Sequence, residues 1–189
     1  MRYRMPRIPQ QPVPGPAGRH ATLTLELADV VAGARRRALR DADRQIDTAH
    51  LLHSLIESDP AVRAVFEGDS QLARVLGYLV QRSIGYGLRW QGSVEDSGAL
   101  PVVSRRDLAV RDSGMGGWSP SAAAAMSGAL DRSAGRGDVR TGGLDLLAVL
   151  AVDRECRAVE VLTRAGVDAG RLAARIADVR DRGVREAKG

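Results

Sequence analysis

The 189-residue chain has few aromatic residues and only one cysteine. Aromatic side chains make up 3% of the sequence, so its core must be built from Ala, Leu, Val and Ile. Ala and Leu are strong helix formers, which favours packed helices over a sheet. Cys156 alone cannot form an internal disulfide. This excludes a disulfide scaffold and is typical of proteins in a reducing compartment.

The sequence also has neither a long apolar run nor a secretory signal. Its longest apolar stretch, residues 144–152, contains Asp145 and is far shorter than the about 20 residues that cross a bilayer. Residues 1–18 are basic and proline-rich but have no apolar centre, unlike a signal peptide. We therefore expect a cytoplasmic protein.

Lysine is nearly absent, and arginine supplies most of the formal charge of +5. The densest basic run is Arg35–Arg37 with Arg40 and Arg44, and phosphate contacts need little more than placed cations. A basic helical nucleic-acid-binding protein is therefore the alternative function. No recognition motif accompanies the run, and aromatic residues are too scarce for base stacking. A solvent-exposed helix face is the preferred interpretation.

One sequence pattern occurs twice in the chain. The string I-D-T-A-H-L-L-H-S-L-I begins at Ile46, and T-G-G-L-D-L-L-A-V-L-A begins 95 positions later, at Thr141. The same offset relates Leu23 to Trp118, which stand at the start of the two copies. Two copies of this length indicate a pseudo-symmetric helical domain instead of a solenoid.

Caps and apolar spacing predict four helices in the first copy. Helical spacing begins at Leu23, on a stripe that includes Leu39. Thr48 is the expected cap of the second helix. Asp59-Pro60 should open a third helix that ends near Glu67, because Asp is a good cap and proline is favoured at the first helical position. Ser70 should cap a fourth helix.

The second copy predicts the same plan. Ser119-Pro120 should open a long helix to about Gly135, followed by a helix through residues 144–150. A helix over 154–164 and one capped by Asp168 complete the copy. The expected fold is all-α, with two pseudo-symmetric four-helix repeats in one domain. Its expected parts are a proline-rich disordered arm (1–20), the first repeat (21–84), a glycine-rich linker (85–117), the second repeat (118–182) and a tail (183–189).

The repeated strings resemble the double-repeat N-terminal domain of the Clp ATPases of the ClpC, ClpA and ClpB type. The resemblance covers about residues 23–179. It is carried by the string from Ile46, by Trp118-Ser119-Pro120 with the alanines that follow, and by V-L-T-R-A-G-V-D-A-G-R-L from Val161. It implies a docking module that receives substrates, adaptors or modified peptides for attached ATPase rings. The chain has no G-x-x-x-x-G-K-[ST] phosphate loop, so we expect the docking domain alone, without enzymatic activity.

The chain departs from the family pattern at the ligand-binding positions. In ClpC-like proteins the Glu of a T-E-H string helps to bind phosphoarginine, and the matching positions here are Ala49 and Leu144. Apolar side chains offer no charge-assisted partner to a guanidinium, so we expect this recognition to be weakened or lost. Gly143 and Asp145 replace Thr48 and His50 in the second copy, so the halves should differ in chemistry.

The resemblance places the ligand in a groove between the repeats, and we predict Leu23, Arg36, Trp118 and Ser119 near it. Trp118 is the first candidate, because an amphipathic ring at the mouth of a groove can anchor a peptide. The alternative is that Trp118 packs the start of the second long helix. We predict no cofactor and no catalytic residue.

Two further residue types could carry chemistry. His50 and His53 could share one helix face, as a metal site needs, but we expect no Cys, Asp or Glu beside them at ligand spacing. We therefore predict no metal site, and the resemblance makes His50 structural. Cys156 is expected on the helix over 154–164 as a small core residue, not a nucleophile.

These observations together predict a non-catalytic protein- or peptide-binding module of the Clp protease system. It would act as an adaptor, a client-docking factor or a competitor for ligands. The expected partners are Clp ATPase or protease subunits, adaptors or client peptides, with no membrane and no nucleic acid among them.

Overall fold

The computed structural model describes residues 22–83 and 117–186. The predicted arm (1–20) and nearly all of the predicted linker (85–117) lie outside the described residues. Within them the fold is all-α, with four helices in each repeat, as predicted. The first repeat contains β1 (Thr22–Leu23), α1 (Leu25–Arg40), α2 (Thr48–Ser58), α3 (Pro60–Arg63) and α4 (Gly68–Ser83). The second contains α6 (Pro120–Gly135), β2 (Arg140–Thr141), α7 (Gly143–Leu150), α8 (Arg157–Arg164) and α9 (Ala169–Glu186).

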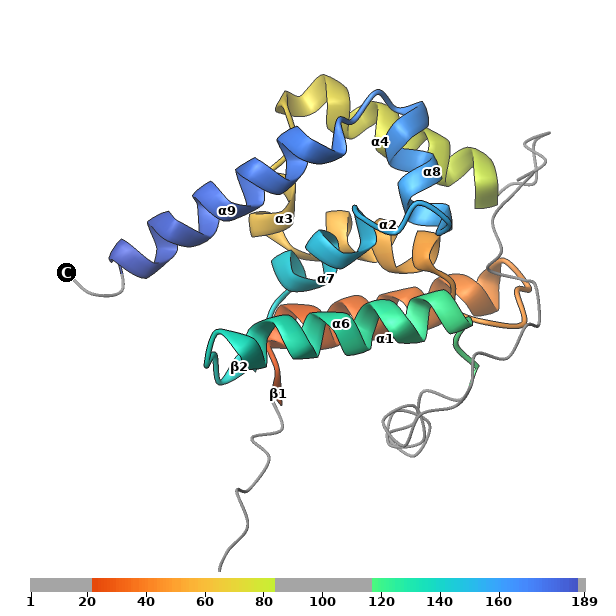
Figure 1. The fold of residues 1–189 in the computed structure, drawn as a ribbon. Helices are drawn as coiled ribbons and strands as arrows, with labels where there is room; N and C mark the ends of the chain where they lie inside the picture. Colours follow the sequence, from red (N-terminus) through yellow and green to blue (C-terminus); the bar gives the residue numbers. More distant parts are fainter. Residues whose placement is uncertain (1–21, 84–116, 187–189) are drawn as a thin grey trace, which may run out of the picture.

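The second helix of each repeat lies at the centre of the molecule. In Figure 1, α1 and α6 run along one side and α4 and α9 along the opposite side, with α2, α3 and α7 between them. α2 packs against α1 of its own repeat and against α7 and α8 of the other. Both central helices supply fully buried leucines to one shared core: Leu51, Leu52, Leu55, Leu146, Leu147 and Leu150.

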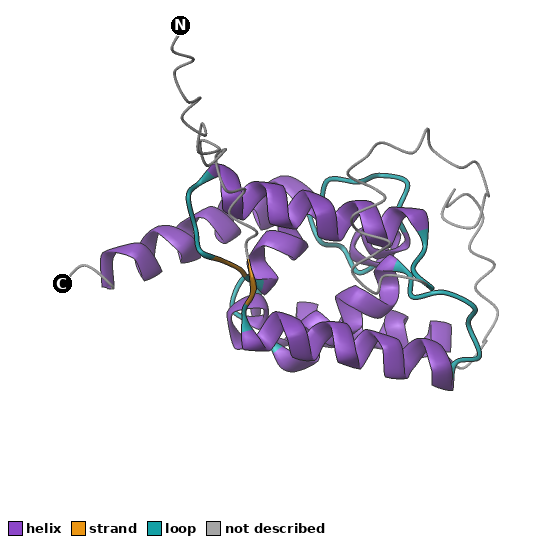
Figure 2. Cartoon of the chain, turned by 90° about the horizontal axis from the view of Figure 1, so that it is seen from below, coloured by secondary structure: helices purple, strands orange, loops and turns teal. Residues whose placement is uncertain are grey.

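Two short backbone pairings link the repeats in a pseudo-symmetric way. β1 pairs with β2 in parallel, with Leu23 opposite Thr141, and Ile46 forms a parallel bridge with Trp118. The offset of 95 relates Leu23 to Trp118 and Ile46 to Thr141, so the two pairings are the same contact made twice. Figure 2 shows the strand pair as a small element among helices. The sequence predicts no strand here, because two residues are too few to show strand periodicity.

The first two helices begin one or two residues away from the predicted positions. Leu23 belongs to β1, and α1 begins after Thr24, whose hydroxyl accepts a hydrogen bond from the Leu27 N–H at 3.2 Å. The predicted cap at Thr48 is wrong, because Asp47 caps α2. The Thr48 hydroxyl instead accepts the Ala158 N–H of α8 at 3.1 Å. Leu39, predicted on the apolar stripe of α1, is 75% exposed.

Other helix ends also differ from the prediction. α3 ends at Arg63 instead of near Glu67, and α4 begins at Gly68, before the expected cap Ser70. α8 begins at Arg157 because Cys156 is its N-cap, so this cysteine is buried as predicted but lies outside the helix. α9 continues to Glu186.

Three predicted caps are confirmed, and all three are local in sequence. Asp59 and Ser119 each precede a proline at the first helical position, and their side chains accept backbone N–H groups of α3 and α6. Asp168 accepts the Arg171 N–H at 2.7 Å at the start of α9.

The last helix of each repeat also donates a hydrogen bond to the other repeat. Arg74 of α4 donates to the Ala165 carbonyl that follows α8, at 3.1 Å. Arg175 of α9 donates in the same way to the Phe66 carbonyl that follows α3, at 2.8 Å. Carbonyls at the ends of helical segments thus accept hydrogen bonds across the repeat boundary, and the Phe66 carbonyl also accepts the Gly68 N–H of its own repeat at 2.9 Å. None of the described helices is both long enough and apolar enough to cross a membrane.

Candidate functional site

An open groove of about 500 Å³ lies between the two repeats. Three helices begin at it, namely α1, α3 and α7, and β2 and α9 complete its walls. The first repeat supplies Thr24, Glu26, Asp59, Pro60 and Ala61, and the second supplies Asp138, Arg140, Gly142, Gly143, Leu144, Asp145 and Arg180.

The acidic residues of the groove follow from these helix starts. Glu26 lies in the first turn of α1, Asp59 caps α3, and Asp145 lies in the first turn of α7. Carboxylates are favourable at helix N-termini, where unsatisfied N–H groups and the helix dipole concentrate positive potential. The groove is therefore rich in carboxylates because three helices begin at it and each has an acidic residue at its start.

Asp145 is neutralised by two arginines. One of its oxygens accepts the Gly142 N–H at 3.2 Å, and the other accepts a hydrogen bond from Arg136 at 2.6 Å and forms an ion pair with Arg180, also at 2.6 Å. Partial burial alone would lower the pKa of Arg136, but the hydrogen bonds to Asp145 and Asp138 raise it above its ordinary value. Asp138 pairs with Arg136 at 2.7 Å.

Asp59 is buried at the groove without a cationic partner among the described residues. It is 6% exposed, and its Oδ1 accepts the N–H groups of Ala61 and Val62 at 2.9 and 3.3 Å. Its Oδ2 lies against Gly143 at the start of α7, where a Cβ would overlap it. The same Cβ would stand 3.1 Å from the Leu55 Cδ2. Glycine at this position lets the carboxylate approach α7.

The start of α2 in the first repeat is equivalent to the start of α7, and a buried network of ion pairs surrounds it. Asp47 corresponds to Gly142 and His50 to Asp145. Asp47 pairs with Arg82 of α4 and with Arg157 at the start of α8, the latter at 2.6 Å. Burial would raise the pKa of the Asp47 carboxyl, but the hydrogen bond to His50 and the charge of Arg82 hold it well below its usual range. This network therefore joins both repeats.

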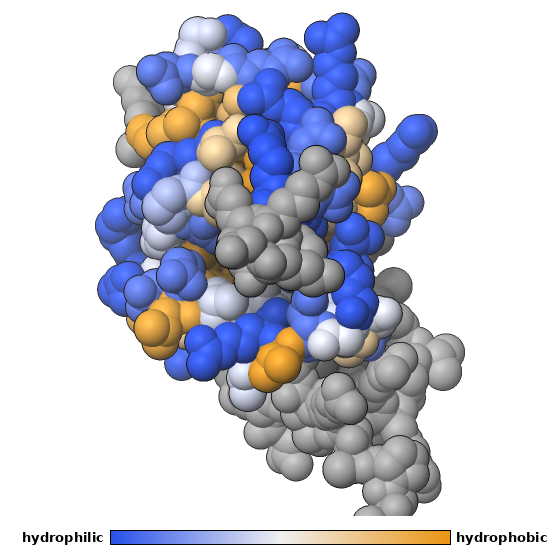
Figure 3. All heavy atoms as spheres, turned by 90° about the vertical axis from the view of Figure 1, so that its left-hand side faces the viewer, coloured by the Kyte–Doolittle hydropathy of each residue, from blue (hydrophilic) through white to orange (hydrophobic). Residues whose placement is uncertain are grey.

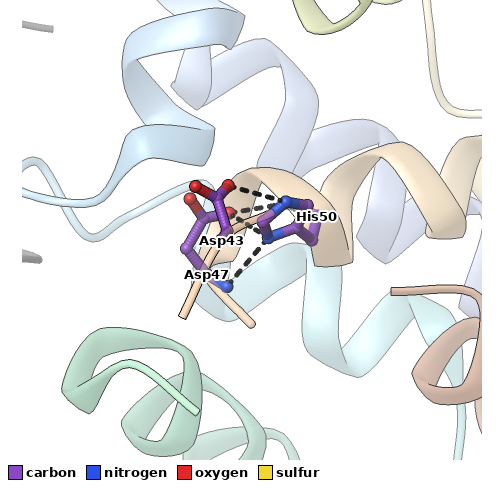
Figure 4. Close-up of side chains that lie close together, drawn as sticks. All are labelled: Asp43, Asp47 and His50. Carbon is purple, nitrogen blue, oxygen red and sulfur yellow. Dashed lines mark hydrogen bonds and ion pairs between the residues drawn. The ribbon is translucent and has the colours of Figure 1, made fainter. Parts of the chain in front are cut away.

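Asp43, Asp47 and His50 lie close enough together to share a cation (Figure 4), which corrects the expectation that no carboxylate stands near His50. Their atoms are engaged within the protein. The His50 Nδ1 accepts the Asp47 N–H at 3.1 Å, and its Nε2 lies 3.2 Å from Asp43. The guanidiniums of Arg82 and Arg157 supply the positive charge that a metal ion would bring. Asp47 and His50 together form the capping box of α2.

The four predicted site residues do not lie together in the structure. Leu23 is half-buried in β1, and Trp118, only 7% exposed, belongs to the other backbone pairing. Ser119 is buried and caps α6 by accepting the Ala122 N–H at 3.1 Å. Arg36 is exposed on α1. None of the four lines the groove, although Leu23 directly precedes Thr24, which does.

The two positions that match the family's Glu differ in accessibility. Ala49 is 1% exposed inside α2, whereas Leu144 is half-buried and lines the groove. The sequence alone could not show which of the two side chains is accessible, because both are apolar residues at matching positions of the repeat. The groove residues Asp59 and Arg180 were also missed as site candidates, since they come from segments that only the fold brings together.

The predicted basic run, which lies on α1 and in the loop after it, is divided by its contacts. Arg37 is turned inward, pairing with Glu57 and donating to the His53 Nδ1 at 3.1 Å. Arg40 pairs with Asp41 at 3.2 Å. Arg36 and Arg44 remain exposed. The run therefore does not form one continuous cationic face.

The side of the molecule on which β2 and the end of α9 lie is mainly polar. Figure 3 shows hydrophilic residues over most of its coloured surface, with apolar side chains in small separate patches. Leu25 and Val139, which adjoin the groove residues Glu26 and Asp138 in sequence, are 77% and 79% exposed. A ligand on this side would meet charged groups and isolated apolar contacts, not one broad apolar surface.

Comparison with known proteins identifies the fold. No family model and no curated protein matches the chain. Among solved structures, it is similar to the N-terminal domain of the caseinolytic protease associated chaperone ClpD from Arabidopsis thaliana, with a TM-score of 0.54 and 18% sequence identity. The match covers 90% of this chain and 97% of that chain. The chain therefore has the fold of a Clp N-terminal domain.

Proposed function

We propose that this protein is a non-catalytic protein- or peptide-binding module of the Clp protease system. The observation that carries the proposal is the complete double-repeat fold of a Clp N-terminal domain with an open groove between its repeats. In this role it delivers clients as an adaptor, docks them, or competes for ligands of a Clp ATPase. Its partners are Clp subunits, adaptors or client peptides.

The composition of the groove supports binding as its role. Most of its polar groups lie at the starts of helices. The Thr24 hydroxyl, for example, caps α1 by accepting the Leu27 N–H. Leu144 supplies an apolar contact beside these groups. Concave sites that combine apolar contacts with a few fixed polar groups are typical of ligand binding. Because Ala49 and Leu144 carry no charge, we propose that the groove does not recognise phosphoarginine.

Pull-down from lysate of the source cells, read by mass spectrometry, tests the proposal. The tagged protein should enrich Clp subunits, adaptors or known Clp clients, and Leu144→Arg should reduce this enrichment because it puts a long charged side chain into the groove. Val152→Arg is the matched control, because Val152 is 66% exposed and does not line the groove. Recovery of none of these proteins, where an authentic Clp N-terminal domain recovers them, would overturn the proposal.

The nucleic-acid alternative has less support. Its motivation was the arginine run of α1, and two members of that run, Arg37 and Arg40, are engaged with carboxylates. A cationic surface that binds phosphates needs its charges free and contiguous. A gel shift with double-stranded DNA and single-stranded RNA at low salt should therefore show no retarded band.

A further inference from the structure

We infer that the groove selects client segments that carry an unmodified basic side chain, arginine or lysine, whose cationic group is received by Asp59. The inference rests on the proposed function and names the chemical class of its ligand. It is carried by a buried carboxylate that lines the groove and has one oxygen without a hydrogen-bond partner.

The geometry of Asp59 makes it a preorganised acceptor. Its Oδ1 is fixed by two N–H groups of α3, so the carboxylate cannot rotate freely. Its Oδ2 accepts no hydrogen bond from the described residues. The hydrogen bonding of the carboxylate is therefore incomplete at Oδ2, which is not fully buried and is open to a donor in the groove. A ligand guanidinium or ammonium would complete it with a charge-assisted hydrogen bond.

The balance of charge in the groove favours the same ligand. Asp138 and Asp145 are already paired with arginines. Glu26 and Asp59 have no cationic partner among the described residues. Arg140, which is exposed, is the groove cation without a carboxylate partner there. The unpaired groups thus leave an excess of negative charge in a protein whose formal net charge is +5.

An anionic ligand is disfavoured at the place that would otherwise attract it. The start of α7 is one feature of the groove that would attract an anion, because the dipole and the first-turn N–H groups of a helix favour negative charge at its N-terminus. The Asp59 carboxylate already stands against Gly143 at this start. A phosphate or carboxylate of a ligand would meet the negative charge of Asp59 at short range.

Matched peptides test this selection directly. We would titrate ¹⁵N-labelled full-length protein with Ac-Ala-Leu-Arg-Leu-Ala-NH2 and with the same peptide carrying citrulline, the neutral isostere of arginine, or glutamate. The arginine peptide should shift the amides of Gly142, Gly143 and Leu144. It should bind about five- to tenfold more tightly than the citrulline peptide, as expected for one charge-assisted hydrogen bond at a half-open site. The glutamate peptide should bind most weakly.

Two variants assign the effect to Asp59. Asp59→Asn keeps an oxygen that can cap α3 but removes the charge, so arginine and citrulline peptides should then bind equally. Asp168→Asn is the matched control, because Asp168 also caps a helix and does not line the groove. It should keep the preference for arginine.

The possible outcomes separate this inference from the proposed function. Equal binding of arginine and citrulline peptides to the wild-type protein, or an unchanged preference in Asp59→Asn, would overturn the inference while Clp-system partners were still recovered in the pull-down. Loss of those partners from the pull-down would overturn the proposed function. Circular dichroism of both variants should show the wild-type helix content, so that a lost preference cannot come from unfolding.

Discussion

His50 and Asp145 occupy the same position in the two repeats and make the same contact. The His50 Nδ1 accepts the N–H of Asp47 at 3.1 Å, and an Asp145 oxygen accepts the N–H of Gly142 at 3.2 Å. Both residues stand at the third position of a central helix and accept the N-cap N–H; in α2 this contact completes a capping box with Asp47, whereas Gly142 has no side chain to complete one in α7. Different side chains therefore preserve one structural contact, although the sequences suggest that the halves differ in chemistry at this point.

Asp145→Ala should lower the free energy of unfolding by about 2 to 4 kcal/mol. The variant loses the cap acceptor of α7 and leaves Arg136 and Arg180 beside each other without their shared carboxylate. Urea unfolding followed by circular dichroism measures the change. Asp181→Ala, at an exposed position of α9, should stay within about 0.5 kcal/mol of the wild type. Equal losses in both variants would contradict the structural role of Asp145.

His53 should make stability depend on pH between its folded and unfolded pKa values. Burial and the Arg37 and Arg40 guanidiniums lower the pKa of His53 from 6.5 to about 4, against the opposing charges of Glu57 and Asp41. His53 is therefore neutral when folded and takes up a proton on unfolding. Its contribution is complete above pH 6.5 and is lost as the pH falls toward 4, by up to about 3 kcal/mol.

Urea unfolding at pH 7, 5.5 and 4.5 measures this dependence. The wild-type protein should lose more stability across the series than His53→Gln, which has no titrating ring. The difference between the two proteins isolates His53 from other groups that titrate in the range. Parallel curves for wild type and variant would show that the pKa of His53 is not lowered.

Trp118 should behave as a core residue and not as a ligand contact. In a Trp90→Phe background it is the only tryptophan, and at 7% exposure its emission should be blue-shifted and only weakly quenched by acrylamide. Because Trp118 does not line the groove, addition of the arginine peptide should leave its emission unchanged. A spectral shift on peptide addition would instead support the prediction that Trp118 contacts the ligand.

Gly143→Ala should disturb both stability and the groove. Its Cβ would overlap the Asp59 Oδ2 and crowd the Leu55 Cδ2, so the carboxylate that caps α3 must move. We expect a loss of about 1 to 3 kcal/mol in unfolding free energy and a weaker preference for the arginine peptide. Gly77→Ala, in α4 with open space around it, should instead stabilise by about 0.5 to 1 kcal/mol. Stabilisation by both substitutions would contradict the close approach of Asp59.

The sequence by itself determined the elements whose causes are local. Asp59-Pro60, Ser119-Pro120 and Asp168 predict helix starts because each cap accepts a backbone N–H only two or three residues away. The 95-residue offset predicts the pseudo-symmetric pair of helical repeats, since matching apolar spacing produces matching helices. These features need no knowledge of where the rest of the chain lies.

The tertiary structure decided the contacts between residues that are distant in sequence. Thr48 and Asp47 are both good capping residues, and the choice between them coincides with the bond from the Ala158 N–H of α8 to the Thr48 hydroxyl. Asp59 likewise meets Gly143 in the groove across the repeat boundary. Neither residue carries a local signal for this meeting. The packing of α3 against α7 brings them together, and so it decides which charges a ligand would meet.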